Sequence, residues 1–158
     1  MLDAPWLSAE KRGLVTLLLT SHQRAFGRPL IAAARAGQSM RLCCQDLFVC
    51  GFPVLSHGIG SDPTLTYANA AALQLWERRW DQLVGMPSRM TAPAEARQER
   101  QQALNTAQMQ DAIWGYGGVR INGDGRRFMI RNARIWTLWD EEERSCGQAA
   151  CFSDWWYL

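Results

Sequence analysis

His57 is the residue whose position most suggests acid–base or cofactor chemistry. It stands between Ser56 and Gly58 at the end of a predicted strand, where an imidazole could ligate haem or serve as a general base. Ser56, His57 and Asp154 include the residue types of a hydrolase triad, but the Gly-x-Ser-x-Gly sequence that presents a nucleophilic serine is absent. No other partner lies at a defined spacing, so we favour a His57 that hydrogen-bonds a turn, and we expect no enzyme.

Arg89 is a second candidate for contact with a small molecule. It follows Pro87 and Ser88, beside a predicted short helix. Its guanidinium could pair with the carboxylate or phosphate of a ligand. It could equally join that helix to Asp81 or to the edge of a sheet, and the sequence does not decide between the two roles.

Asn132, Arg134 and Trp136 lie on a long predicted strand, Phe128 to Trp139. Strict alternation would direct Asn132 and Arg134 into a pocket beside Trp136. A bulge near residues 132–134 would instead turn both toward solvent, while Ala133 and Ile135 pack inside. The second arrangement is slightly favoured.

The cysteines do not indicate a metal or a redox centre. There are five, at positions 43, 44, 50, 146 and 151, with no Cys-x-x-Cys, and neither histidine lies at a metal-ligand spacing from them. We therefore expect small buried thiols and no metal. The sequence does not identify a cofactor, which stays unknown. Reduced cysteines without a signal peptide favour the cytoplasm.

Charge and composition exclude several classes of protein. The chain has 158 residues, 47% of them hydrophobic and 20% charged, with a net charge of +2. These values are typical of one globular domain and not of a disordered chain or a membrane protein. The predicted helix over residues 95–110 places Arg97 and Arg100 among Glu and Gln, which indicates a solvated face. Together with the acidic turn at residues 140–143, this argues against nucleic-acid binding.

Aromatic residues are concentrated at the end of the chain. The sequence has eight Trp and finishes with Trp155, Trp156 and Tyr157 before the last residue. Such a cluster is an exposed apolar patch unless something covers it. Cover from within the chain is one interpretation. The other, which we favour, is a contact with a second copy or a protein partner, because aromatic residues are enriched there.

The order of predicted elements defines the fold class. A helix begins after Ser8, runs to Phe26 and is ended by Gly27, and a short helix is expected over residues 30–36. Residues 37–39 are a candidate linker, and a short helix or loop is expected from Leu47 up to the next strand. Strands near residues 52–57 and 65–67 precede helices over 70–77, which Asn69 caps, over 80–84 and from Pro93 to about Met109. Three strands follow, over residues 113–121, 128–139 and 147–155, with Asn122 to Gly125 forming a hairpin. This order predicts an α+β domain with an antiparallel sheet.

Several segments resemble known families. Leu65 to Trp76 is similar to the PAS segment in which a strand ends in Tyr-x-Asn and a helix begins. Residues 27–30, 54–58, 87–90, 118–128 and 146–155 together resemble the MEKHLA domain, a PAS-like family. The resemblance implies a five-stranded antiparallel sheet with flanking helices, but no catalytic or ligand residues. We expect residues 1–37 to form an N-terminal helical extension packed on a PAS-like domain over residues 38–158.

The resemblance and the absent catalytic motifs favour a non-enzymatic sensory or regulatory module. Such a module would act through protein–protein contacts, with a small-molecule ligand in the PAS pocket as a further option. The alternative is an enzyme or a haem- or flavin-binding protein with a site near His57, Arg89 and the central strand.

Overall fold

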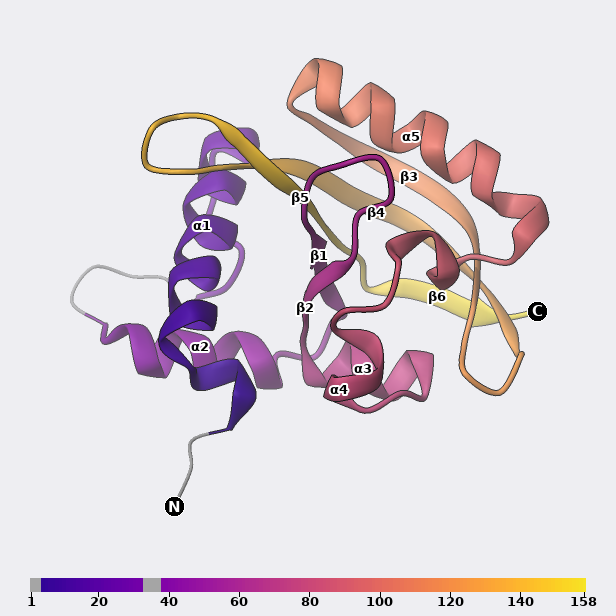
Figure 1. The fold of residues 1–158 in the computed structure, drawn as a ribbon, viewed down its shortest axis with the longest axis horizontal. Coiled ribbons are helices and arrows are strands. Elements are labelled where there is room, and N and C mark those ends of the chain that lie inside the picture. Colours follow the sequence, from indigo (N-terminus) through magenta and orange to yellow (C-terminus); the bar gives the residue numbers. More distant parts are fainter. Residues whose placement is uncertain (1–3, 33–37) are drawn as a thin grey trace.

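An antiparallel sheet with helices on both faces forms the centre of the computed structural model, which describes residues 4–32 and 38–158 (Figure 1). The elements in chain order are the 3₁₀ turn η1 (Pro5–Leu7), α1 (Ala9–Phe26), α2 (Met40–Val49), β1 (Val54–His57), β2 (Leu65–Ala68), α3 (Ala70–Trp76), α4 (Trp80–Leu83), the 3₁₀ turns η2 (Ser88–Thr91) and η3 (Ala94–Ala96), α5 (Arg97–Gln110), β3 (Ala112–Ile121), β4 (Arg127–Trp139), β5 (Ser145–Cys151) and β6 (Asp154–Tyr157).

The strands follow the order β2-β1-β5-β4-β3, and β6 pairs with β4. The five-stranded sheet expected from the sequence is therefore confirmed, with a short sixth strand added. β6 continues β5 along the same edge of β4, because Cys151 lies opposite Arg134 and Asp154 lies opposite Arg131 in one register. The strand predicted over residues 147–155 is present but interrupted at residues 152–153.

Two bulges bend the pair β3 and β4. The register shifts on either side of Tyr116, and Gly115 and Asn132 have φ angles of 75° and 56°. An extra residue on β3 is thus compensated by an extra residue on β4. The bulge considered for residues 132–134 is confirmed, and it leaves Ala133 and Ile135 buried.

The two faces of the sheet carry separate cores. We call the face that packs on α1 and α2 the α1 face, and the opposite face, which packs on α3 and α5, the cavity face (Figure 1). Trp136 and Leu138 of β4 point to the α1 face, whereas Ile130 and Ile135 point to the cavity face. Across residues 4–32 and 38–158, no helix combines the length and the apolar character needed to cross a membrane.

α1 begins and ends as the sequence predicts. The Ser8 side chain accepts a hydrogen bond from the backbone of Lys11, and Gly27 ends the helix with a φ of 72°. Trp136 Nε1 donates to the Leu18 carbonyl at 3.3 Å across the α1 face. The helix therefore shares a core with the sheet.

α2 is an element that the sequence analysis missed. Residues 37–39 were expected to be a linker, with a helix or loop only from Leu47. Ser39 instead caps a helix, and its buried side chains recur at helical spacing: Cys43, Cys44, Leu47 and Phe48. Of the helix expected over residues 30–36, residues 33–36 lie outside the described residues, and Leu30 and Ile31 form a bend.

Asn69 joins α2, β1 and α3. Its side-chain oxygen accepts from the backbone of Ala72 at 3.2 Å, which caps α3, and from Val54 at 2.9 Å. Its amide nitrogen donates to the carbonyls of Leu47 and Phe52 at 3.2 and 2.9 Å. Because Asn69 is fully buried, these bonds fix the start of β1 beside the end of α2.

Candidate ligand-binding site

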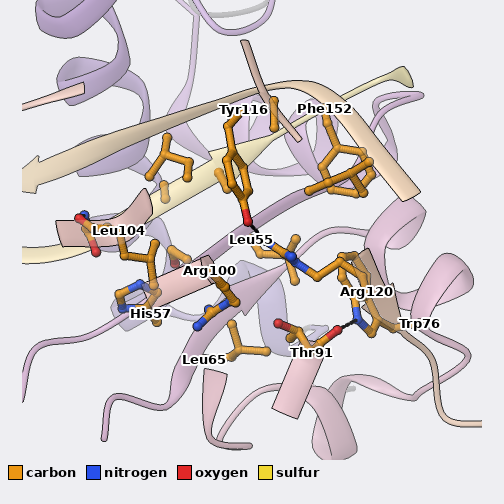
Figure 2. A pocket seen from close by; sticks show the side chains of 17 residues that line it. Leu55, His57, Leu65, Trp76, Thr91, Arg100, Leu104, Tyr116, Arg120 and Phe152 are labelled. Atoms are coloured by element: carbon orange, nitrogen blue, oxygen red, sulfur yellow. Dashed lines mark hydrogen bonds between the residues drawn. The ribbon is translucent and has the colours of Figure 1, made fainter. Parts of the chain in front are cut away.

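A cavity of about 60 Å³ lies between the cavity face of the sheet and α5 (Figure 2). That volume is room for about four to six water molecules. Its wall is mostly apolar and also contains a few polar side chains that converge from different elements. The lining residues are Leu55, Ser56, His57, Leu65, Trp76, Thr91, Arg100, Leu104, Tyr116, Arg120, Ile130, Ala133, Ile135, Gln148, Ala149, Ala150 and Phe152.

Arg100 of α5 points into this cavity (Figure 2). Only 7% of it is exposed, so the prediction that Arg100 belongs to a solvated face is wrong. The physical reason is its spacing, because Arg100, Leu104 and Ala107 form the buried stripe of α5. Its guanidinium makes no hydrogen bond or ion pair with any residue in the described ranges. Burial, followed by the charge of Arg120, lowers the pKa of Arg100 to about 10.

Arg120 of β3 brings a second cation to the cavity. It is 6% exposed. Its Nη2 donates to the Tyr116 hydroxyl at 3.1 Å, and its Nη1 donates to the Val119 carbonyl at 2.9 Å. Both acceptors are neutral. Gly118 lies between Tyr116 and Arg120 on the same face, and a Cβ there would come within 2.6 Å of the Tyr116 hydroxyl. The missing side chain at Gly118 therefore makes room for this pair.

The cavity has a positive charge that the described part of the chain does not neutralise. Its lining includes Arg100 and Arg120 but no Asp or Glu. Taking a charged group out of water costs several kcal/mol unless a partner of opposite charge compensates it. Buried charges in a cleft are therefore candidates for functional groups.

His57 is the predicted site residue that does line the cavity. Its Nδ1 lies 2.8 Å from the Gly58 carbonyl, as expected for a histidine that fixes a turn. Burial lowers the pKa of His57, so the ring is neutral at neutral pH, Nδ1–H donates and Nε2 can accept. Nε2 is buried and has no partner among the described residues.

A second hollow, of about 120 Å³, adjoins the cavity. His57, Leu104 and Gln148 line both spaces and thus form their common wall. Gln148 Nε2 donates to the Leu104 carbonyl at 2.9 Å, which ties β5 to α5 at this wall.

The other predicted ligand residues do not join His57. Arg89 is half-exposed and pairs with Asp62 at 3.1 Å, neither with Asp81 nor with a cavity group. Asn132 is exposed at the bulge. The bulge therefore directs its side chain away from the interior.

Arg134 and Trp136 lie on the α1 face. The Arg134 guanidinium is 5.7 Å from the centre of the Phe26 ring, and Trp136 is fully buried against α1. The chain thus brings together a site of His57, Arg100 and Arg120. Arg100 and Arg120 were not among the site residues predicted from the sequence. Arg100 lies at helical spacing from the buried Leu104, and Arg120 alternates along β3 with the buried Tyr116.

The residue types of a hydrolase triad are not assembled. Ser56 Oγ lies 2.8 Å from Thr66 Oγ1, and Asp154 pairs with Arg131 at 2.7 Å. Among the residues that the structure describes, His57 therefore has neither a hydrogen-bonded nucleophile nor an orienting carboxylate.

The chain-end aromatics are partly covered. Trp155 packs on Phe128, with ring centroids 6.1 Å apart, and the Arg126 guanidinium lies 3.6 Å from the centre of the Tyr157 ring. Trp156 lies on the face of β6 opposite to Trp155 and Tyr157, and it is 43% exposed. Only part of this cluster is therefore open surface.

A family model for the MEKHLA domain matches residues 12–157. The chain belongs to the MEKHLA domain family. The matched range includes most of α1 as well as the whole sheet. No curated protein matches the chain.

Solved structures with a PAS fold resemble this MEKHLA domain. An RNA-binding light-oxygen-voltage receptor matches with a TM-score of 0.66 and 14% identity, over 80% of this chain and 36% of that one. The MEKHLA domain thus spans about a third of that receptor. A PAS domain from Colwellia psychrerythraea matches with a TM-score of 0.63 and 12% identity, over 73% and 95% of the two chains.

The light-oxygen-voltage domain of a blue-light-activated histidine kinase from Erythrobacter litoralis matches with a TM-score of 0.56 and 19% identity, over 66% of this chain and 96% of that one. These similarities confirm the α+β, PAS-like fold.

A flavin does not fit the cavity of the MEKHLA domain. Its volume, about 60 Å³, is below the roughly 150 Å³ in which a single benzene ring binds, whereas a flavin has three fused rings. None of the five cysteines lines the cavity. Haem is larger still and is excluded by the same volume. Within the described residues no group of three His, Cys, Asp or Glu could hold a metal ion.

Proposed function

We propose that this MEKHLA domain is a non-enzymatic sensory module that binds a small molecule in its interior cavity and responds by a change in its contacts with another protein. The observation that carries the proposal is the cavity itself, an apolar space with two buried cations that no described carboxylate neutralises. An uncompensated buried charge is costly to retain. Occupation by a ligand would supply the missing partner.

The cavity is well placed to couple a ligand to the rest of the domain. Arg100 comes from α5 and Arg120 from β3, so a ligand that contacts both would change how the helix packs on the sheet. β3 is bonded along its length to β4, whose other edge carries β6 and its aromatics. A shift of β3 can thus reach Trp156 through one strand.

Thermal denaturation with small molecules of different charge tests ligand binding. We expect at least one compound of up to about six non-hydrogen atoms to raise the Tm of the wild-type protein. Ala133→Leu fills the cavity, because Ala133 is fully buried in its wall, and this variant should show no such rise. The proposal fails if no neutral, anionic or cationic compound raises the wild-type Tm.

For the output contact we propose the surface around Trp155, Trp156 and Tyr157, which a second copy or a protein partner would cover. Trp156 is 43% exposed, and the Arg131 guanidinium lies 5.5 Å from the centre of its ring. Tryptophan and arginine are the residues most enriched at the energetic centres of interfaces.

Light scattering across a dilution series tests a contact between copies. We expect Trp156→Ala to shift the protein toward the monomer without unfolding it. Met109→Ala removes another exposed apolar side chain, 88% exposed on α5, and should leave association unchanged. A wild type that is strictly monomeric at high concentration and has no partner in pull-down assays would contradict the contact.

A further inference from the structure

We propose that the cavity ligand is a short-chain monocarboxylate, held by its carboxylate between Arg100 and Arg120 with its alkyl group against the apolar wall. This inference rests on the proposed function and specifies the chemical class of its ligand.

The donors available in the cavity require an anion. Arg100 donates none of its five N–H groups to any described residue. Arg120 donates to a hydroxyl and to a carbonyl, and both of these acceptors are neutral. A neutral ligand would satisfy some of these donors but would leave two cations in a space without counter-charge. A carboxylate supplies one negative charge that both guanidinium groups can share, together with the planar pair of oxygens that guanidinium groups bind.

The apolar part of the wall limits the ligand to one charged group. Leu55, Leu65, Ile130 and Phe152 contact the space but offer no side-chain donor. Phosphate or a dicarboxylate would place further charged oxygens against these side chains, where each would lose hydration without a hydrogen bond. A short alkyl group would instead gain by leaving water.

The volume sets the length of the ligand. A space of about 60 Å³ takes about four to six atoms of the size of a water oxygen. Acetate and propionate, with four and five non-hydrogen atoms, satisfy this limit. Hexanoate does not.

Isothermal titration calorimetry of the full chain at constant ionic strength tests the inference. The probes are sodium acetate, propionate, hexanoate and phosphate, and the neutral propionamide. We expect propionate to bind one to one, and at least about tenfold more tightly than propionamide, phosphate or hexanoate. A charge-assisted hydrogen bond lowers the Kd by about 10- to 100-fold.

Variants locate the binding. Arg100→Gln should weaken propionate binding by about tenfold or more. Arg97→Gln is the matched control, because Arg97 lies on the same helix outside the cavity and donates to the Ala92 carbonyl. It should bind within about twofold of the wild type, since surface charges contribute little. If Arg100→Gln does not fold, Arg120→Lys tests the same claim. It keeps the charge but loses the planar pair of donors, and it should weaken propionate binding.

The inference is overturned if propionamide or phosphate binds as tightly as propionate, or if wild-type protein shows no heat of binding with propionate. It is equally overturned if propionate binds a folded Arg100→Gln or Arg120→Lys protein as tightly as the wild type. If propionate does not bind, but a neutral compound raises the Tm of wild type and not of Ala133→Leu, the carboxylate is excluded while the proposed function is preserved.

Discussion

The hydroxyl of Tyr116 lies 3.1 Å from the guanidinium of Arg120, across a glycine that leaves the space between them open. Both side chains come from the cavity face of one strand, so the backbone of β3 sets their separation. The bulge at Gly115 and the edge position of β3 leave this strand with one neighbour. The open space above Gly118 lets the two side chains meet.

Gly118→Ala should disturb the Tyr116–Arg120 pair. The new Cβ would lie 2.6 Å from the Tyr116 hydroxyl and 3.1 Å from Arg120 Nη1, so one side chain must move. We expect propionate affinity to fall by about tenfold, measured by calorimetry. Gly13→Ala, on the exposed side of α1 with nothing near its Cβ, should leave affinity unchanged and stabilise the protein by up to about 1 kcal/mol. Equal affinities in the two variants would contradict the prediction.

Arg100→Met should stabilise the ligand-free protein. The substitution keeps a flexible apolar chain in the cavity and removes a buried cation that has no described partner. We expect a gain of about 1–2 kcal/mol in the free energy of unfolding, measured by urea denaturation. Gln98→Met, exposed on the same helix, should change it by less than about 0.5 kcal/mol. A loss of stability in Arg100→Met would mean that the guanidinium holds the fold.

Acid should destabilise the protein through His22. Burial, followed by the charge of Arg134, lowers the pKa of His22 from 6.5 to about 4. The unfolded state therefore takes up a proton first as the pH falls below 6.5, and stability falls until the folded state is also protonated near pH 4. The total contribution is about 3 kcal/mol.

The variant His22→Asn isolates this contribution. Asn can keep the hydrogen bond that Nδ1 makes to the Arg28 carbonyl at 3.0 Å but does not titrate. The difference in unfolding free energy between wild type and variant should shrink or reverse from pH 7 to pH 4. Parallel stability curves across that range would show that His22 does not titrate as described.

Asn69→Ala should be among the most destabilising single substitutions. It removes the cap of α3 and leaves the backbone groups of Val54, Leu47 and Phe52 without their bonds to this buried side chain. We expect a loss of about 2–4 kcal/mol, measured by thermal or urea denaturation. Asn105→Ala, exposed on α5, should cost less than about 0.5 kcal/mol. Similar costs for the two would contradict the role of Asn69.

Local signals were sufficient for much of the fold. Ser8, Asn69 and Gly27 cap their helices as expected, because capping depends on residues close in sequence. The hairpin at Asn122 also follows its sequence, with Asn122 Oδ1 accepting from the backbone of Asp124 and Arg126.

The site could not be predicted in the same way. A surface role was assigned to Arg100 from residue type, since buried unpaired arginines are rare, whereas its spacing with Leu104 placed it inside. Arg134 lies on the α1 face, opposite the cavity, because the bulge at Asn132 changes which side chains of β4 face each way. The sequence indicated the bulge, but the contact of Arg134 with Phe26 of α1 joins residues far apart in the chain and could not be predicted from neighbouring residues.

The most direct test of a ligand inside this MEKHLA domain is an isotope-filtered NOE spectrum of labelled protein with unlabelled propionate, which at 17.9 kDa is within reach of solution NMR. NOEs from the propionate methyl group to the methyl groups of Leu55, Leu65 and Ile130 are the predicted result. No NOE at saturating propionate, or NOEs confined to exposed residues such as Ile59 and Leu158, would contradict the account.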